Sequence, residues 1–189
     1  MRAIAEDLAE YAGRLEGSWR VEIGAAGPVL AMTHRPNRFH GTIHRIREQL
    51  DAQLPSTDPG HICANGPVID HAGIARMRLP GAVVIPETCL DEEGLAVDAT
   101  QVLAVVEVLS PLDPDHIYRE KLADYPAMGI PHYLIVDPRT GTIEVHSEPC
   151  GDRYRNKEPY IYGDTVPFGP WTVETRDFRR YGKAGNDAG

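Results

Sequence analysis

The stretch Leu103-Ala104-Val105-Val106-Glu107-Val108-Leu109-Ser110-Pro111 decides the fold. An apolar, valine-rich run that ends at Ser-Pro is typical of a central strand buried on both faces of a sheet. The run contains one carboxylate, that of Glu107. Because an unpaired charge inside such a strand costs several kcal/mol, we expect a cation to bind it: a lysine, an arginine or a metal ion. Lys121, in the helix expected next, is the candidate lysine.

The flanking sequence predicts a mixed sheet. Pro111 and the acidic residues after it predict a helix over residues 115–127, which stops at Gly129, and residues 133–136 form the next apolar strand. A strand, a helix and a strand in this order imply a partly parallel sheet. Further helices are expected over 3–16 and 37–53, and further strands over 19–23, 29–33, 143–146 and 154–161 and near residues 62, 68 and 83. We therefore expect an α/β or α+β fold, in which helices flank one central mixed sheet.

Length and composition are those of one globular domain, which we place at residues 1–178, followed by a disordered tail at 179–189. No segment has the roughly 20 apolar residues that span a bilayer, and the acidic N-terminus is not a secretory signal. The three cysteines fit a reducing cytoplasm. The net charge of −9 argues against indiscriminate binding of nucleic acid, so DNA would need a local basic patch. The candidate patches are Arg76 with Arg78, and Arg153 with Arg155 and Lys157.

Several blocks, taken in order and spacing, resemble one known family over residues 14 to 178. The blocks are Arg20-Val21-Glu22-Ile23-Gly24, His40 at the start of a helix, Val105 to Pro111, Lys121, Tyr125, and Gly129-Ile130-Pro131-His132-Tyr133-Leu134-Ile135-Val136-Asp137. The family is the Uma-two family of restriction endonuclease-like proteins, within the PD-(D/E)XK nuclease superfamily.

This resemblance implies a restriction endonuclease-like fold that cleaves DNA phosphodiesters with Mg²⁺ or Mn²⁺. Glu107 would be the catalytic metal ligand, Lys121 would position or activate the attacking water, and Glu22 would be a further acidic residue of the site. In the superfamily's simplest pattern the lysine stands two residues after the glutamate, where this chain has Leu109. Leu109 shares a sheet face with Glu107, so a lysine supplied from the helix is chemically plausible. A homodimer is expected, and no organic cofactor.

Two positions depart from the family's pattern. Where the family has Pro-Asp before a strand, this chain has Pro80-Gly81, so one metal ligand is missing. Ile117 stands where many members have an aspartate, and Asp113 or Asp115 could substitute for it in space. Magnesium usually takes one or two protein carboxylates, so we expect weak Mg²⁺ binding, which Gly81→Asp should strengthen.

Other readings of these residues compete with the catalytic ones. His40 lines the site or is an ordinary residue of the helix surface. His40 and His44 lie four apart, but Gly41 replaces the glutamate of a zinc-protease helix, which argues against zinc. Tyr125 is expected to be a core aromatic, and Ser110 caps a turn because no histidine and aspartate at triad-like spacing support a nucleophile.

Three classes of function remain open from the sequence. The first is a divalent-metal-dependent DNA endonuclease that uses Glu107, Lys121 and Glu22. The second is a degenerate, catalytically inactive nuclease fold that binds nucleic acid or a protein partner without cleavage. Gly81 and the acidic net charge favour this second class. The third is a subunit of a larger complex.

Overall fold

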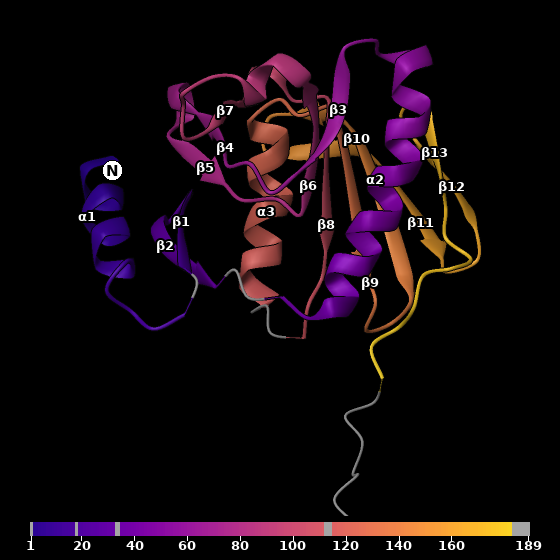
Figure 1. Cartoon of the computed structure of the whole chain (residues 1–189), viewed down its shortest axis with the longest axis horizontal. Coiled ribbons are helices and arrows are strands. Elements are labelled where there is room, and N and C mark those ends of the chain that lie inside the picture. The colour runs from indigo at the N-terminus through magenta and orange to yellow at the C-terminus, as the bar shows by residue number, and fades with distance from the viewer. Residues whose placement is uncertain (1, 18, 33–34, 112–114, 183–189) are drawn as a thin grey trace, which may run out of the picture.

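The structure, a computed structural model, describes residues 2–17, 19–32, 35–111 and 115–182 (Figure 1). Its helices are α1 (Arg2–Ala12), α2 (Asn37–Thr57) and α3 (Asp115–Ala127), with short 3-10 turns η1 (Ala72–Ile74), η2 (Glu87–Leu90) and η3 (Ala99–Gln101). Its strands are β1 (Trp19–Gly24), β2 (Gly27–Met32), β3 (His61–Asn65), β4 (Ile69–His71), β5 (Arg76–Arg78), β6 (Ala82–Pro86), β7 (Val97–Asp98), β8 (Ala104–Val108), β9 (His132–Asp137), β10 (Thr142–Cys150), β11 (Arg153–Ile161), β12 (Thr165–Phe168) and β13 (Trp171–Glu174). The predicted mixed α/β or α+β architecture is confirmed.

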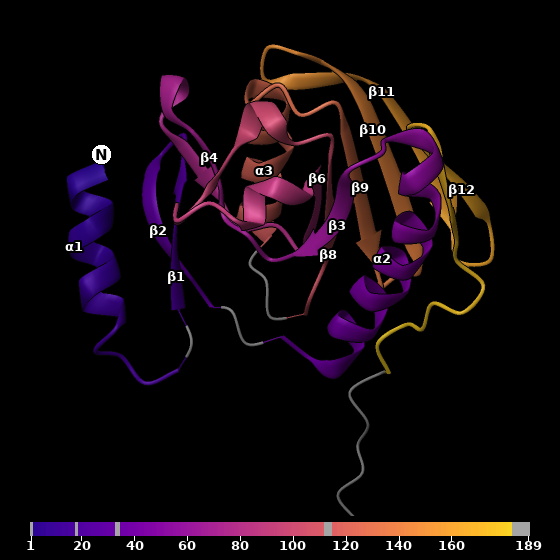
Figure 2. The same cartoon turned by 45° about the horizontal axis from the view of Figure 1, so that its top comes forward.

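The central sheet has six strands in the order β11-β10-β9-β8-β6-β3. Only β8 and β9 run parallel, joined by α3, and the other neighbours are antiparallel. Helix α2 and the β12–β13 hairpin cover one face, while α3 covers the other (Figures 1 and 2). The strand that holds Glu107 is therefore internal, as its sequence predicts.

Alternation along β8 decides which side chains meet each helix. Ala104, Val106 and Val108 belong to the core cluster on the α2 side, whereas Val105 and Leu109 belong to the cluster on the α3 side. Glu107, which alternates with Val106 and Val108, therefore shares the α3 face.

A second sheet lies on the far side of α3, with the order β2-β1-β5-β4-β7 (Figure 2). Arg76 and Arg78 of β5 and Glu22 of β1 contact side chains of α3. Helix α3 is thus enclosed between two sheets, so polar groups on both of its sides must find partners within the protein.

Some local expectations need correction. Helix α2 continues past residue 53 to Thr57, and β5, β7, β12 and β13 were not expected from the sequence. The predicted disordered tail falls mainly on residues 183–189, outside the described part of the chain. Among the described helices, none combines the length and apolarity that a membrane span needs.

Candidate functional site

Glu107, Lys121 and Tyr125 form a buried hydrogen-bonded group between β8 and α3. Glu107 Oε1 accepts hydrogen bonds from Lys121 Nζ at 2.7 Å and from the Tyr125 hydroxyl at 2.6 Å. Lys121 is 4% exposed and Tyr125 is fully buried. The prediction that Lys121 on the following helix lies beside the strand carboxylate is confirmed, and Tyr125 is a core aromatic that also binds the carboxylate.

Glu22 of β1 reaches the same group from the second sheet. Its Oε1 lies 3.4 Å from Lys121 Nζ and accepts a hydrogen bond from the Leu79 amide at 3.3 Å. Its Oε2 accepts from Arg78 Nη1 at 2.9 Å. The structure thus brings together all three predicted site residues, although this proximity does not assign them a role.

Arg78 is the centre of the charged network that surrounds these residues. It is fully buried and donates to Glu22, to Glu120 Oε2 at 2.8 Å and, through Nε, to Asp124 Oδ2 at 2.8 Å. Arg76 Nε binds the other oxygen of Asp124 at 2.7 Å. Arg76 with Arg78, one of the two candidate basic patches, is therefore not an exposed patch, because strand β5 turns Arg78 inward onto the acidic face of α3.

The network favours the charged forms of Glu22 and Lys121 and the neutral form of Tyr125. Burial alone would raise the pKa of Glu22, but Lys121 and Arg78 lower it below its ordinary value. Burial opposes the charged form of Lys121, yet Glu107 and Glu22 raise its pKa above the ordinary value. Burial and the Glu107 carboxylate raise the pKa of Tyr125, so the phenol stays a hydrogen-bond donor. Across the described ion pairs, three cations face four carboxylates, which leaves little excess negative charge.

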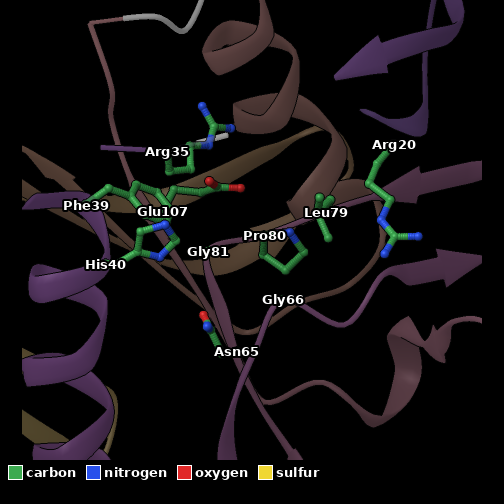
Figure 3. Close-up of a pocket in the computed structure, with 10 residues that line it drawn as sticks. All are labelled: Arg20, Arg35, Phe39, His40, Asn65, Gly66, Leu79, Pro80, Gly81 and Glu107. Atoms are coloured by element: carbon green, nitrogen blue, oxygen red, sulfur yellow. The ribbon is translucent and has the colours of Figure 1, made fainter. Parts of the chain in front are cut away.

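A cavity of about 230 Å³ opens beside Glu107. Figure 3 shows Arg35, His40 and Glu107 at one side of the cavity and Arg20 at the other. The remaining lining residues are Phe39, Asn65, Gly66, Leu79, Pro80 and Gly81. The sequence left open whether His40 lines the candidate site or lies on the helix surface, and in the structure it lines the cavity.

Gly81 lies where the register brings β6 next to Glu107. Ala82 pairs with Val106, so Gly81 stands one step further along, opposite Glu107. A Cβ at Gly81 would lie 2.8 Å from Ile43 Cδ1 and 3.0 Å from the Val106 carbonyl oxygen. Position 81 therefore carries no carboxylate, and a side chain there would require Ile43 and the Val106 backbone to shift.

The residues that the structure describes do not, as they stand, form a site for a divalent metal ion. Both hydrogen bonds described for Glu107 end on Oε1, and Glu22 is held by Arg78, Lys121 and Leu79. Among the described side chains, no three His, Cys, Asp or Glu residues gather so that they could hold a metal, and His40 with His44 forms no such group. Asp113 and the side chains of Asp115 and Ile117 lie outside the described residues.

Sequence reasoning missed Asp124 and Glu120. Their spacing was a usable signal, because Glu120, Lys121, Asp124 and Tyr125 lie on adjacent turns of one helix and share a face. The partners of that face, Arg76 and Arg78, lie on strand β5, which the sequence does not predict.

Comparison with known proteins identifies the family to which the chain is related. The family model Uma2, described as "Putative restriction endonuclease", matches residues 5–170. A solved structure from Anabaena variabilis ATCC 29413, described as a putative nuclease belonging to DUF820, has 13% identity and a TM-score of 0.64, and the match covers 90% of this chain and 96% of that one. A cryoEM structure of a DrdV–DNA complex has 12% identity over 65% of this chain and 12% of that one, and its TM-score of 0.35 is too low to support a conclusion. No curated protein matches. The first structure shares the fold, and the family match over most of the sequence shows that the chain belongs to the Uma2 family.

Proposed function

We propose that this protein is a restriction endonuclease-like protein that binds the phosphate backbone of nucleic acid in the cavity beside Glu107 without cleaving it. The observation that carries the proposal is the state of Glu107. Its Oε1 is bonded to Lys121 and Tyr125, and Gly81 stands opposite it in place of a second carboxylate. With one carboxylate on the cavity wall, and one of its oxygens already bonded, we expect Mg²⁺ to bind weakly.

Charge around the cavity favours a phosphate. Two arginines, Arg20 and Arg35, line the cavity against one carboxylate, that of Glu107, which also pairs with Lys121, so cationic side chains outnumber anionic ones around it. The first turn of α2 borders the same cavity through Phe39 and His40, and its N-cap residue, Pro36, makes no side-chain capping hydrogen bond. The partial positive charge of a helix N-terminus adds to the attraction for an anion.

Because the protein carries a net charge of −9, we expect nucleic acid to bind at this cavity and not indiscriminately elsewhere on the surface. Substitutions at the cavity and away from it test this expectation. Fluorescence anisotropy with labelled duplex and single-stranded DNA, in EDTA, should show binding that weakens steeply with salt. The double variant Arg20→Ala/Arg35→Ala should reduce affinity at least about tenfold, or about 1.4 kcal/mol. The matched control is Arg153→Ala/Arg155→Ala on exposed strand β11, which should bind as wild type does.

A second candidate function is a divalent-metal-dependent DNA endonuclease, which the convergence of Glu107, Lys121 and Glu22 favours. A supercoiled-plasmid nicking assay with Mg²⁺ or Mn²⁺ separates the two. We expect no cleavage by the wild-type protein. Nicking that disappears in Glu107→Gln and in Lys121→Ala, both shown to be folded, would overturn the non-cleaving proposal. Absence of both binding and cleavage would overturn both candidates and leave a protein partner.

A further inference from the structure

The C-terminal segment of the described chain is fixed beside the first turn of α2. Phe178 is buried in the core cluster on the α2 side. Just beyond it, the carbonyl oxygen of Arg180 accepts a hydrogen bond from Arg38 Nη1. The Tyr181 amide donates to the Pro138 carbonyl oxygen at 2.9 Å. The segment is therefore held against both the start of α2 and the turn between β9 and β10 (Figures 1 and 2).

This arrangement gathers three arginines from distant parts of the sequence. Arg38 is on α2, Arg139 is in the turn between β9 and β10, and Arg180 is in the C-terminal segment. All three are exposed. The Arg180 guanidinium lies against the turn, because a Cβ at Gly141 would collide with it. These three residues are called the arginine patch below.

The patch has an excess of positive charge on a protein whose net charge is −9. Arg139 is paired with Asp137, with 2.9 Å between Nε and Oδ1. Within the described residues, no carboxylate forms an ion pair with Arg38 or Arg180. Arg38 uses one of its five N–H groups for the Arg180 carbonyl and keeps the others. The exposed neighbours in the segment add one charge of each sign, Asp177 and Arg179.

The patch begins next to the cavity. Arg35, Phe39 and His40 line the cavity, and Arg38 belongs to the same first turn of α2. The cavity of about 230 Å³ is smaller than the roughly 300–1,000 Å³ of pockets that enclose drug-sized ligands. It therefore holds one phosphate with little of the strand attached. The rest of a bound strand must lie on the surface outside the cavity.

We propose that the arginine patch binds the phosphate backbone of a nucleic acid strand where the strand leaves the cavity. This inference rests on the proposed function and adds the path of the strand, from Arg35 in the cavity to Arg38 and Arg180 outside it. The planar N–H fork of a guanidinium matches the oxygens of a phosphate. Arg139 contributes less, because Asp137 already holds it. Phosphate contacts carry no sequence information, so binding at the patch is independent of base sequence.

The test measures the affinity for labelled duplex DNA in EDTA as a function of salt concentration. Each phosphate contact steepens the slope of log K against log salt by about 0.9. Arg38→Ala/Arg180→Ala should therefore make the slope shallower by about 2 and weaken binding at least about tenfold. Arg38→Lys/Arg180→Lys keeps both charges and should retain the wild-type slope. Duplexes of unrelated sequence should be affected equally.

Two controls separate the loss of charge from damage to the fold. Arg180→Ala alone preserves the oxygen that binds Arg38, because that oxygen belongs to the backbone, and should make the slope shallower by about 1. Arg153→Ala/Arg155→Ala on exposed β11 removes the same number of charges elsewhere and should leave the slope unchanged. Urea unfolding of each variant shows that it is folded.

The possible results distinguish this inference from the proposed function. An unchanged slope in folded Arg38→Ala/Arg180→Ala, with binding lost in Arg20→Ala/Arg35→Ala, would overturn the inference alone. A slope in the lysine variant as shallow as in the alanine variant would also overturn it, because the arginines would then act through the fold. Loss of binding in the patch variant alone would support the patch and overturn the cavity as the binding site. No binding by the wild-type protein would overturn both.

Discussion

A single methyl group at Gly81 is expected to destabilise the protein, although glycine-to-alanine changes often stabilise. The new Cβ would lie 2.8 Å from Ile43 Cδ1 and 3.0 Å from the Val106 carbonyl oxygen. Carbon atoms pack best at about 3.5–4.0 Å, and overpacking of a core costs about 1–3 kcal/mol. Alanine also restricts the unfolded chain more than glycine does, which stabilises the folded protein by about 0.4–1 kcal/mol and offsets part of this cost. Gly81→Ala should therefore lower the free energy of unfolding by about 1–2 kcal/mol.

The closest of these contacts can be removed separately. Ile43→Val deletes Cδ1 and, because Ile43 is buried, should itself cost about 0.5–1.5 kcal/mol. In the Ile43→Val background the cost of Gly81→Ala should fall, which gives a favourable coupling of about 1 kcal/mol in a double-mutant cycle. Gly94→Ala is the control, because a Cβ there meets only an ordinary contact of 3.5 Å.

Urea unfolding followed by circular dichroism measures all four proteins of the cycle, with unchanged m-values as the condition for comparison. The reasoning fails if Gly81→Ala is as stable as wild type, or if its cost does not depend on residue 43. The same geometry bears on Gly81→Asp. The sequence predicts that this change strengthens metal binding, and the structure adds that Ile43 must shift or be made smaller to accommodate the aspartate.

Three further outcomes follow from the buried groups. Arg78→Met should cost about 3–5 kcal/mol in chemical denaturation, because it leaves buried carboxylates unpaired, whereas Arg153→Met on exposed β11 should change stability by less than about 0.5 kcal/mol. Burial raises the pKa of the Cys63 thiol to about 12, so mass spectrometry after brief iodoacetamide treatment near pH 8 should find the half-buried Cys150 labelled and Cys63 unmodified. The pKa of Glu22 is lower in the folded protein than the unfolded value of about 4.3, so the ionised carboxylate stabilises the fold above that pH. This stabilisation is lost as the pH falls through the folded pKa. Glu22→Gln should therefore weaken the dependence of the free energy of unfolding on pH in the acid range.

The sequence is sufficient to predict the parts of the site that come from one strand and the helix directly after it. The apolar run around Glu107 predicts β8, and the turn residues that follow it predict α3, which the structure has at Asp115–Ala127. The pairing of Glu107 with Lys121 follows because a strand and the helix after it must pack together. These predictions needed only local periodicity and one short connection.

Where distant segments meet, the sequence was not sufficient. Strand β5 has three residues and no apolar alternation, so nothing local indicates that Arg78 points inward. Its burial depends on Glu22, far upstream, and on Asp124, far downstream. The crowding at Gly81 is equally non-local, since Ile43 comes from α2 and Val106 from the neighbouring strand. Side-chain packing of this kind is decided by tertiary contacts that no window of sequence contains.

The charged network means that substitutions of Glu107 or Lys121 alter stability as well as any activity. Removing Glu107 leaves the Lys121 ammonium with a single nearby carboxylate, and removing Lys121 leaves Glu107 unbalanced, so either loss costs stability whether or not the protein cleaves DNA. The presence of both residues is therefore expected from the stability of the fold alone, with or without a metal. It follows that loss of a measured activity in Glu107→Gln or Lys121→Ala identifies a catalytic role only if the free energy of unfolding is measured on the same protein.

The Glu107→Gln/Lys121→Met double variant separates a structural role from a catalytic one more clearly, because it removes both charges together. If the pair is structural, the double variant should be more stable than either single variant, and its DNA binding should equal that of wild type.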